Sequence, residues 1–194
     1  MAARNYFALS NFGTHYFLED FVDSDTVPAS VQVGTNEFEG IISCSSFNLQ
    51  KNTQKYNTLD GNGWESVVAL GNQMEDLEFE AIRLGTGNVY DGTPGTSTFT
   101  LIEEWFMGAT AGAGNASPKT LIEIIPRGAG AEMVYEATAF NVIPKAFNAG
   151  AKNTDDGQLF NFTLSPFGPP HPCTVEFTPK TDNTPATFKL TKIS

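Results

Sequence analysis

Short segments of alternating apolar and polar residues, separated by Gly, Asn, Asp and Pro, run through this sequence. The clearest begins at Leu77, where Leu77, Phe79 and Ala81 alternate with Glu78 and Glu80. A period of two places the apolar side chains on one face of a strand and the acidic ones on the other. We therefore predict strands at residues 30–33, 37–49, 64–70, 77–83, 119–127, 133–144, 159–164, 174–178 and 187–191.

One segment has helical periodicity instead. Phe99 and Ile102 lie three residues apart, and further apolar residues follow at three- and four-residue spacing. Thr100 and Glu103 have the spacing of a capping box. These features predict one helix over residues 98–107.

Composition favours one β-rich domain over a disordered or helical chain. Hydrophobic residues make up 40% of the 194 residues, charged residues make up 17%, and sixteen Phe favour sheets. We predict a single domain, residues 1–194, of mainly β structure: two packed antiparallel sheets, as a sandwich or half-barrel, with one flanking helix. We also expect an irregular N-terminal arm at residues 1–28, long loops near residues 50–63 and 145–157, and a stiff link at residues 166–172.

The charge balance argues against a nucleic-acid-binding groove. The net charge is -11, from 11 Lys plus Arg against 22 Asp plus Glu. Binding to DNA or RNA depends on neutralising phosphates with basic side chains, which this chain lacks in number. An acidic surface repels DNA and would let it slide past without adhering; simple solubility is the alternative interpretation.

No complete catalytic or metal-binding motif occurs in the sequence. No serine lies in a Gly-x-Ser-x-Gly nucleophile elbow, and His15 and His171 lack the partners and spacing of a zinc site. Residues 60–64 (DGNGW) are better explained as a tight turn than as a calcium loop. We therefore expect no enzymatic activity, no cofactor and no metal.

Cysteine content and hydropathy indicate an intracellular site of synthesis. Cys44 and Cys173 do not make a disulfide framework, residues 1–18 do not form a secretory signal, and no apolar run approaches the ~20 residues that span a bilayer. We expect folding in a reducing cytoplasm.

Several stretches resemble a known family. They are residues 55–65 (KYNTLDGNGWE), 77–80 (LEFE), 101–106 (LIEEWF), 125–128 (IPRG) and 156–170 (DGQLFNFTLSPFGPP). These runs resemble tail-tube (major tail) proteins of long-tailed bacteriophages and of prophages of Gram-positive bacteria. The resemblance extends from about Tyr56 to the end of the sequence.

The resemblance implies a structural role in a virion tail. Family members form homohexameric rings that stack into the tail tube, and strands from every subunit join into one inner barrel through which DNA passes. It also implies synthesis in the host bacterial cytoplasm and contacts with a tape-measure protein and with tail terminator or baseplate proteins. Inter-ring contacts in this family come from a long loop or hairpin and from terminal arms. The corresponding candidates here are Tyr6, Phe7, Phe17, Tyr56, Asn57 and Asp155.

Glu78 and Glu80 are candidate lumen-facing residues, because they lie on the polar face of their strand. An outer, solvent-exposed face is an equally good interpretation of the same alternation. A β-sandwich surface-binding or decoration module of a virion is the main alternative function, although Trp64 and Trp105 suit core packing better than an exposed binding platform. A hydrolase on a β scaffold is the third possibility.

Overall fold

The computed structural model describes residues 13–45, 49–57, 65–82, 97–107, 117–127, 134–150, 159–182 and 184–193. This part of the chain is mainly β with one helix, as predicted. In chain order the elements are β1 (His15–Asp20), β2 (Ser30–Gln32), β3 (Ile41–Cys44), β4 (Leu49–Asn57), β5 (Glu65–Met74), β6 (Leu77–Ile82), α1 (Thr98–Met107), β7 (Lys119–Arg127), β8 (Val134–Asn148), β9 (Leu159–Thr178) and β10 (Thr187–Lys192).

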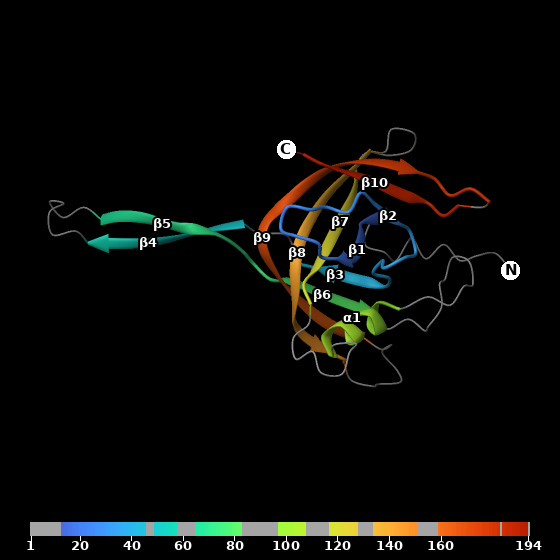
Figure 1. Ribbon diagram of the computed structural model, residues 1–194. Coiled ribbons are helices and arrows are strands. Elements are labelled where there is room, and N and C mark those ends of the chain that lie inside the picture. Colours follow the sequence, from blue (N-terminus) through green and yellow to red (C-terminus); the bar gives the residue numbers. More distant parts are fainter. Residues whose placement is uncertain are drawn as a thin grey trace.

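One antiparallel sheet forms the body of the molecule and curls until it is nearly closed (Figure 1). Its strand order is β1-β7-β8-β9-β10-β2, and β6 pairs with both β9 and β3. The free edge of β1 bonds to the segment before β3: the Phe38 amide donates to the Tyr16 carbonyl over 2.7 Å, and the Leu18 amide donates to the Asn36 carbonyl over 2.8 Å. These bonds bring the two ends of the sheet together, in agreement with the predicted half-barrel.

Two hydrophobic clusters fill the body. The first lies between β6, β9, β1 and α1, and its centre is the stacked pair Phe79 and Phe162, whose ring centroids are 4.7 Å apart. The second lies where β7 and β8 face β10 and β2, around Phe188. Successive side chains of β1 pack into different clusters: Tyr16 and Leu18 belong to the first cluster, and Phe17 belongs to the second. This alternation explains why β1 is buried on both faces.

The position of β1 corrects the prediction of an irregular arm at residues 1–28. His15–Asp20 pairs in register with β7, from His15 opposite Ile124 to Asp20 opposite Lys119. The sequence HYFLED lacks strict alternation because both faces are buried at its centre, and period-two reasoning misses such strands. Residues 1–12 lie outside the described residues.

Strand β9 corrects the prediction of an irregular link at residues 166–172. It continues through four prolines because its edge towards β8 is paired along most of its length. On the other edge, β6 pairs with residues 159–164 and β10 with residues 173–178, so no described strand pairs with residues 165–171 there. Proline has no backbone N–H and cannot donate a hydrogen bond to a neighbouring strand. The prolines are tolerated in β9 because no described strand lies in the gap between β6 and β10 to receive such a bond. Gly168, at a φ of 72°, lies in the accompanying bulge.

Helix α1 has the predicted bounds but a different cap. The Ser97 side-chain oxygen accepts a hydrogen bond from the Thr100 amide over 3.2 Å, so Ser97 is the N-cap. Thr100 therefore lies inside the first turn, and the capping box predicted from Thr100 and Glu103 is wrong. Buried Phe99, Ile102 and Trp105 then anchor the helix in the first cluster.

We expect Ser97→Ala to lower the free energy of unfolding by about 1 kcal/mol, because the Thr100 amide loses its acceptor. Thr100→Ala is the matched control, since it leaves the Ser97 cap in place and should have a smaller effect. Urea unfolding followed by Trp fluorescence measures both. A larger loss for Thr100→Ala would contradict the assignment of the cap.

Candidate assembly interface

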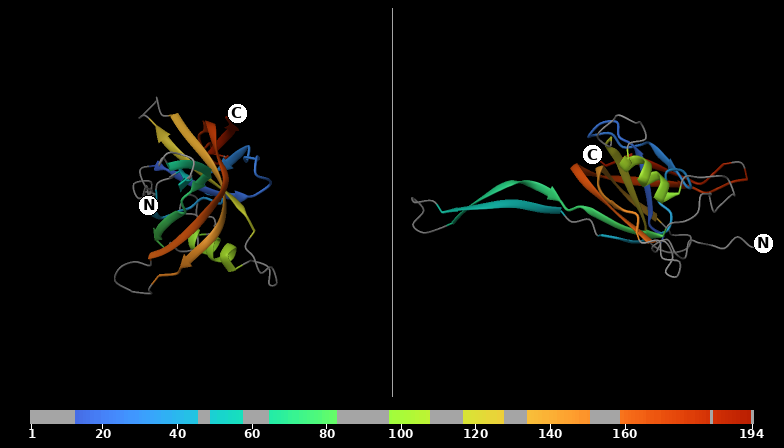
Figure 2. Two further views of the ribbon diagram at one scale, coloured as in Figure 1. Left: turned by 90° about the vertical axis from the view of Figure 1, so that its left-hand side faces the viewer. Right: turned by 90° about the horizontal axis from the view of Figure 1, so that it is seen from below.

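Strands β4 and β5 form a long hairpin that projects away from the body (Figures 1 and 2). They pair from Leu49 opposite Met74 to Asn57 opposite Glu65, and no other described strand pairs with either of them. A two-stranded hairpin alone is marginally stable in water, and its free edges are ready to pair with another chain. The long loop predicted near residues 50–63 is therefore corrected to strand as far as Asn57. The turn dipeptides at residues 60–63 between two strand-length segments were the signal for a hairpin.

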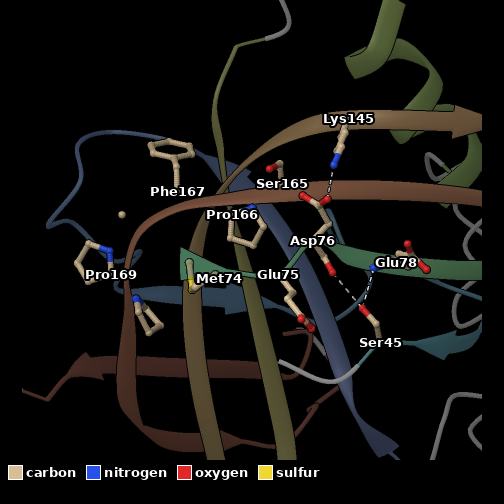
Figure 3. Close-up of a pocket in the computed structure, with 12 residues that line it drawn as sticks. Ser45, Met74, Glu75, Asp76, Glu78, Lys145, Ser165, Pro166, Phe167 and Pro169 are labelled. Carbon is tan, nitrogen blue, oxygen red and sulfur yellow. Dashed lines mark hydrogen bonds and ion pairs between the residues drawn. The ribbon is translucent and has the colours of Figure 1, made fainter. Parts of the chain in front are cut away.

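Polar contacts attach the hairpin to the body at its root (Figure 3). The Ser45 amide donates to the Glu78 carbonyl over 2.8 Å, and the Glu78 amide donates to the Ser45 hydroxyl oxygen over 2.8 Å. The Ser45 hydroxyl also reaches the Asp76 carbonyl at 3.3 Å. Ser45 thus joins the strand entering the hairpin to the strand leaving it.

An ion pair between Lys145 and Asp76 ties the same root to β8. The β8–β9 register shifts between Pro144 and Ala146, so Lys145 is an extra, bulged residue. The hydrogen bond from Lys145 holds the pKa of the Asp76 carboxyl below its ordinary value. The long loop predicted at residues 145–157 is corrected here as well, because β8 continues to Asn148; residues 151–158 lie outside the described residues.

A groove opens beside this root, in the gap between β6 and β10. It has a volume of about 980 Å³ and is lined by residues 165–170 of β9 together with Ser45, residues 74–76, Glu78 and Lys145. We call it the proline groove, because Pro166, Pro169 and Pro170 are among the residues that line it; Pro166 and Pro169 are labelled in Figure 3. Its volume is at the upper end of the ~300–1,000 Å³ that small-molecule pockets occupy, and it is large enough for a short peptide segment.

The candidate lumen residues lie on the outward face of the body sheet. Glu78 is exposed and Glu80 is half-buried, and their side chains alternate with buried Phe79 and Ala81. The residues that pair with Glu78 and Glu80, directly or across β9, are small or polar: Ser43, Thr163, Asn161, Ala146 and Asn148. Ile82 and its partner Leu159 follow on the same face. The side chains of the two glutamates and of the residues paired with them are thus acidic, amide, hydroxyl or methyl groups.

The other predicted contact residues fall into three groups. Tyr6, Phe7 and Asp155 lie outside the described residues. Tyr56 and Asn57 lie at the end of β4, far along the hairpin from its root. Phe17 is 0% exposed in the second cluster, so this contact prediction is wrong: Phe17 is a core residue.

A polar cluster, which the sequence analysis missed, lies at the junction of β1, β3 and β7. The Tyr16 hydroxyl donates to a Glu123 carboxylate oxygen over 3.2 Å, and Cys44 lies beside them. Burial is the main cause that raises the pKa of all three groups, that of the Cys44 thiol to about 12. Such a thiol stays protonated and is a poor nucleophile at neutral pH. The cluster is a structural contact between strands.

Glu123 makes the stability of the body depend on pH. Since the pKa of its carboxyl is raised in the folded protein, its contribution to stability is fully present below pH ~4.5 and is lost as pH rises through the folded pKa. We expect Glu123→Gln to increase the free energy of unfolding by about 0.5–1 kcal/mol at pH 7 and to have no such effect at pH 4. Urea titrations at both pH values measure this, with exposed Glu136→Gln as control. A loss of stability at pH 7 would contradict the expectation.

Both histidines have structural partners. The His171 Nε2 lies 2.7 Å from the Ser24 carbonyl oxygen and fixes the loop between β1 and β2. The His15 Nδ1 lies 2.6 Å from a Glu37 carboxylate oxygen, next to the β1 edge. Within the described ranges, no three His, Cys, Asp or Glu side chains gather where they could hold a metal ion. Nor does α1, the helix described there, have the length and apolar character to cross a membrane.

Chains of two solved structures are similar to this fold. A chain in the 6-fold symmetrised structure of the anti-feeding prophage baseplate superposes with a TM-score of 0.51 and 9% identity, covering 79% of this chain and 87% of its own length. A chain in the anti-feeding prophage tube-terminating cap superposes with a TM-score of 0.50 and 15% identity, covering 80% and 96%. No family model and no curated protein sequence matches the chain. The fold is therefore that of chains found in a prophage baseplate and a tube cap.

Proposed function

We propose that this chain is a structural subunit of a phage-tail-like particle, and that it assembles into hexameric rings that stack as a tail tube. The observation that carries the proposal is the β4–β5 hairpin. It projects from the body with both edges unpaired among the described strands, so it gains stability only against another chain. In this proposal the chain functions through assembly, without catalysis or a cofactor.

The fold likeness supports the same proposal. Chains that share the architecture come from a 6-fold symmetrised baseplate and from a tube-terminating cap. A projecting element that fits a different surface of the next copy makes a head-to-tail contact, and such contacts close into rings or extend into tubes. Tape-measure, terminator and baseplate proteins are the expected partners in the virion tail.

The outward face of β6 supports a lumen role for Glu78 and Glu80. A lumen lined with carboxylates and small polar groups would repel the DNA backbone and allow rapid passage. The net charge of -11 suits a surface from which DNA is released rather than held.

Electron microscopy of the purified, concentrated protein tests the assembly directly. We expect rings or tubes with sixfold symmetry in end-on views. A species that stays monomeric at high concentration, with and without a tape-measure scaffold, would contradict the proposal.

The lumen assignment is tested with tubes of a Glu78→Lys, Glu80→Lys variant. We expect these tubes to retain short linear duplex DNA at least about tenfold more strongly than wild-type tubes at low salt, and to release it as salt rises. Closed circular DNA cannot thread a tube and should not be retained. Glu103→Lys, Glu104→Lys on exposed α1 positions is the charge-matched control. Equal retention of linear and circular DNA by the β6 variant would place these residues on the outside.

A terminating ring is a second candidate function, favoured by the likeness to a cap chain at a TM-score of 0.50. A cap subunit would form single rings that do not stack. Micrographs at increasing protein concentration distinguish the two, because a tube subunit elongates and a cap subunit does not.

A further inference from the structure

The chain returns from the hairpin to the body through a joint of two residues that lie in no strand. Strand β5 ends at Met74 and β6 begins at Leu77, so the joint consists of Glu75 and Asp76. Met74 packs against the first cluster, which fixes the point where the hairpin starts. The direction in which the hairpin projects then depends on the joint.

The joint borders open space on one side. Both of its residues line the proline groove, which has a volume of about 980 Å³ beside them. A segment next to open space can turn without displacing close-packed side chains. The Ser45 hydroxyl contacts the Asp76 carbonyl at 3.3 Å, but this contact joins the two legs of the hairpin to each other. A fixed direction requires contacts between the joint and other strands of the body.

The sheet register places one such contact at Ser165 of β9. Leu77 pairs with Leu164, and both are buried in the first cluster. The next position along these antiparallel strands brings Asp76 opposite Ser165, and alternation turns both side chains to the outward face. The Ser165 hydroxyl donates a hydrogen bond to the Asp76 carboxylate. The joint is therefore attached to β9.

The bulge of β8 supplies a second contact. The register of β8 against β9 shifts between Pro144 and Ala146, which leaves Lys145 as an extra residue beside the joint. Lys145 forms an ion pair with Asp76 across β9 (Figure 3). Strands β8 and β6 are two strand spacings apart, roughly 10 Å, so this contact needs a side chain as long as lysine. One carboxylate thus connects the joint to both β9 and β8.

The exposure of the ion pair suits positioning better than global stabilisation. The Lys145 side chain is 57% exposed and the Asp76 side chain is 28% exposed. Ion pairs in contact with solvent add little to the free energy of unfolding. At a joint, however, a small energy is enough to favour one direction among several of similar energy.

We propose that Asp76 is a positioning residue, and that its contacts with Lys145 and Ser165 form a latch that fixes the direction of the β4–β5 hairpin. The hairpin then already points in one direction when a neighbouring subunit arrives, and less freedom is lost on binding. The effect of the latch on assembly rests on the proposed function. The latch itself is a property of the single subunit and can be measured there.

Distances between two spin labels test the latch in the dilute, unassembled protein. One label is attached at Gln54→Cys on β4, and the other at exposed Thr178→Cys on the body. We expect Asp76→Asn and Lys145→Met each to widen the distribution of label-to-label distances at least about twofold, because the hairpin samples more directions.

Two controls separate the latch from a general loss of structure. Lys189→Met removes an exposed ion pair between β10 and β9 and should leave the distribution unchanged. A label pair on the body, Glu104→Cys with Thr178→Cys, should show no widening in any variant. The native thiols interfere little with labelling, because burial raises the pKa of both Cys44 and Cys173.

Exchange of the two charges gives a readout that a merely structural role would not produce. Asp76→Lys with Lys145→Asp keeps the ion pair in reversed order, and the Ser165 hydroxyl can accept from an ammonium as well as donate to a carboxylate. We expect this double variant to restore a narrow distribution and Asp76→Lys alone to keep it wide. High salt should widen the wild-type distribution and leave that of Lys145→Met unchanged, because salt screens an exposed ion pair.

The same variants connect the latch to assembly. We expect Asp76→Asn and Lys145→Met to raise the protein concentration needed for half-maximal assembly about twofold to fivefold, and the exchanged pair to reverse this rise. Unchanged distance distributions in both single variants would overturn the latch, whether or not the protein assembles. Wider distributions with unchanged assembly would overturn its role in assembly. If the wild type never assembles, the proposed function fails, and the distances still decide whether the latch exists.

Discussion

Excision of the β4–β5 hairpin is expected to give a folded monomer that no longer assembles. In this variant a two-residue Asn-Gly turn replaces residues 46–73 and joins Ser45 to Met74, which packs against the first cluster and is kept. The Ser45 bonds to β6 and the pairing of β3 with β6 remain, so we expect the free energy of unfolding to change by less than about 1 kcal/mol. Assembly should weaken by at least about a hundredfold, because the projecting contact is gone.

Sedimentation velocity and urea unfolding measure the two effects separately. Mixing adds a sharper readout, because excised subunits keep the surface that receives a neighbour's hairpin. They should bind the growing end and stop elongation of full-length protein. Assembly of the excised protein at the wild-type concentration would contradict the role given to the hairpin.

The largest expected loss of stability is at Phe162. This ring is 2% exposed, stacks on Phe79 at 4.7 Å and meets Phe38 edge to face at 5.3 Å. Phe162→Ala should lower the free energy of unfolding by about 3–5 kcal/mol, through lost apolar burial and the cavity left behind. That is a large fraction of the ~5–15 kcal/mol that keeps a typical domain folded.

Phe177→Ala is the matched control for this substitution. Phe177 lies on the same strand but at the rim of the second cluster, 39% exposed, so its removal should cost less than about 1.5 kcal/mol. Urea unfolding of the unassembled protein measures both. Equal losses would contradict the placement of the core.

Sequence reasoning worked best where one face of an element is buried and the other is solvated. Strand β6 and helix α1 satisfy that condition, and each was predicted within one residue of its bounds. The strands predicted at residues 119–127 and 133–144, two alternating segments on either side of a Gly-rich turn, correspond to β7 and to most of β8.

The same reasoning failed where tertiary contacts override local pattern. Strand β1 is buried on both faces, so Tyr16, Phe17 and Leu18 form a continuous apolar run without alternation. The prolines of β9 are local strand breakers, and only the gap between β6 and β10 accommodates them in a strand. The groove in that gap, formed by segments distant in sequence, has no signature in any one of them.

The separation of the hairpin from the body has a kinetic consequence. The body contains both hydrophobic clusters, whereas β4 and β5 pair only with each other among the described strands. In the proposed assembly, the β4–β5 ribbon therefore completes its contacts only when a neighbour is present. The first association of two subunits then includes the entropy cost of ordering the ribbon, which makes this step unfavourable. Each later subunit binds to a ribbon that is already ordered, so its addition costs less. Polymerisation should therefore show a lag that pre-formed ends abolish, so that a cell could hold a stock of monomers until an initiating complex appears.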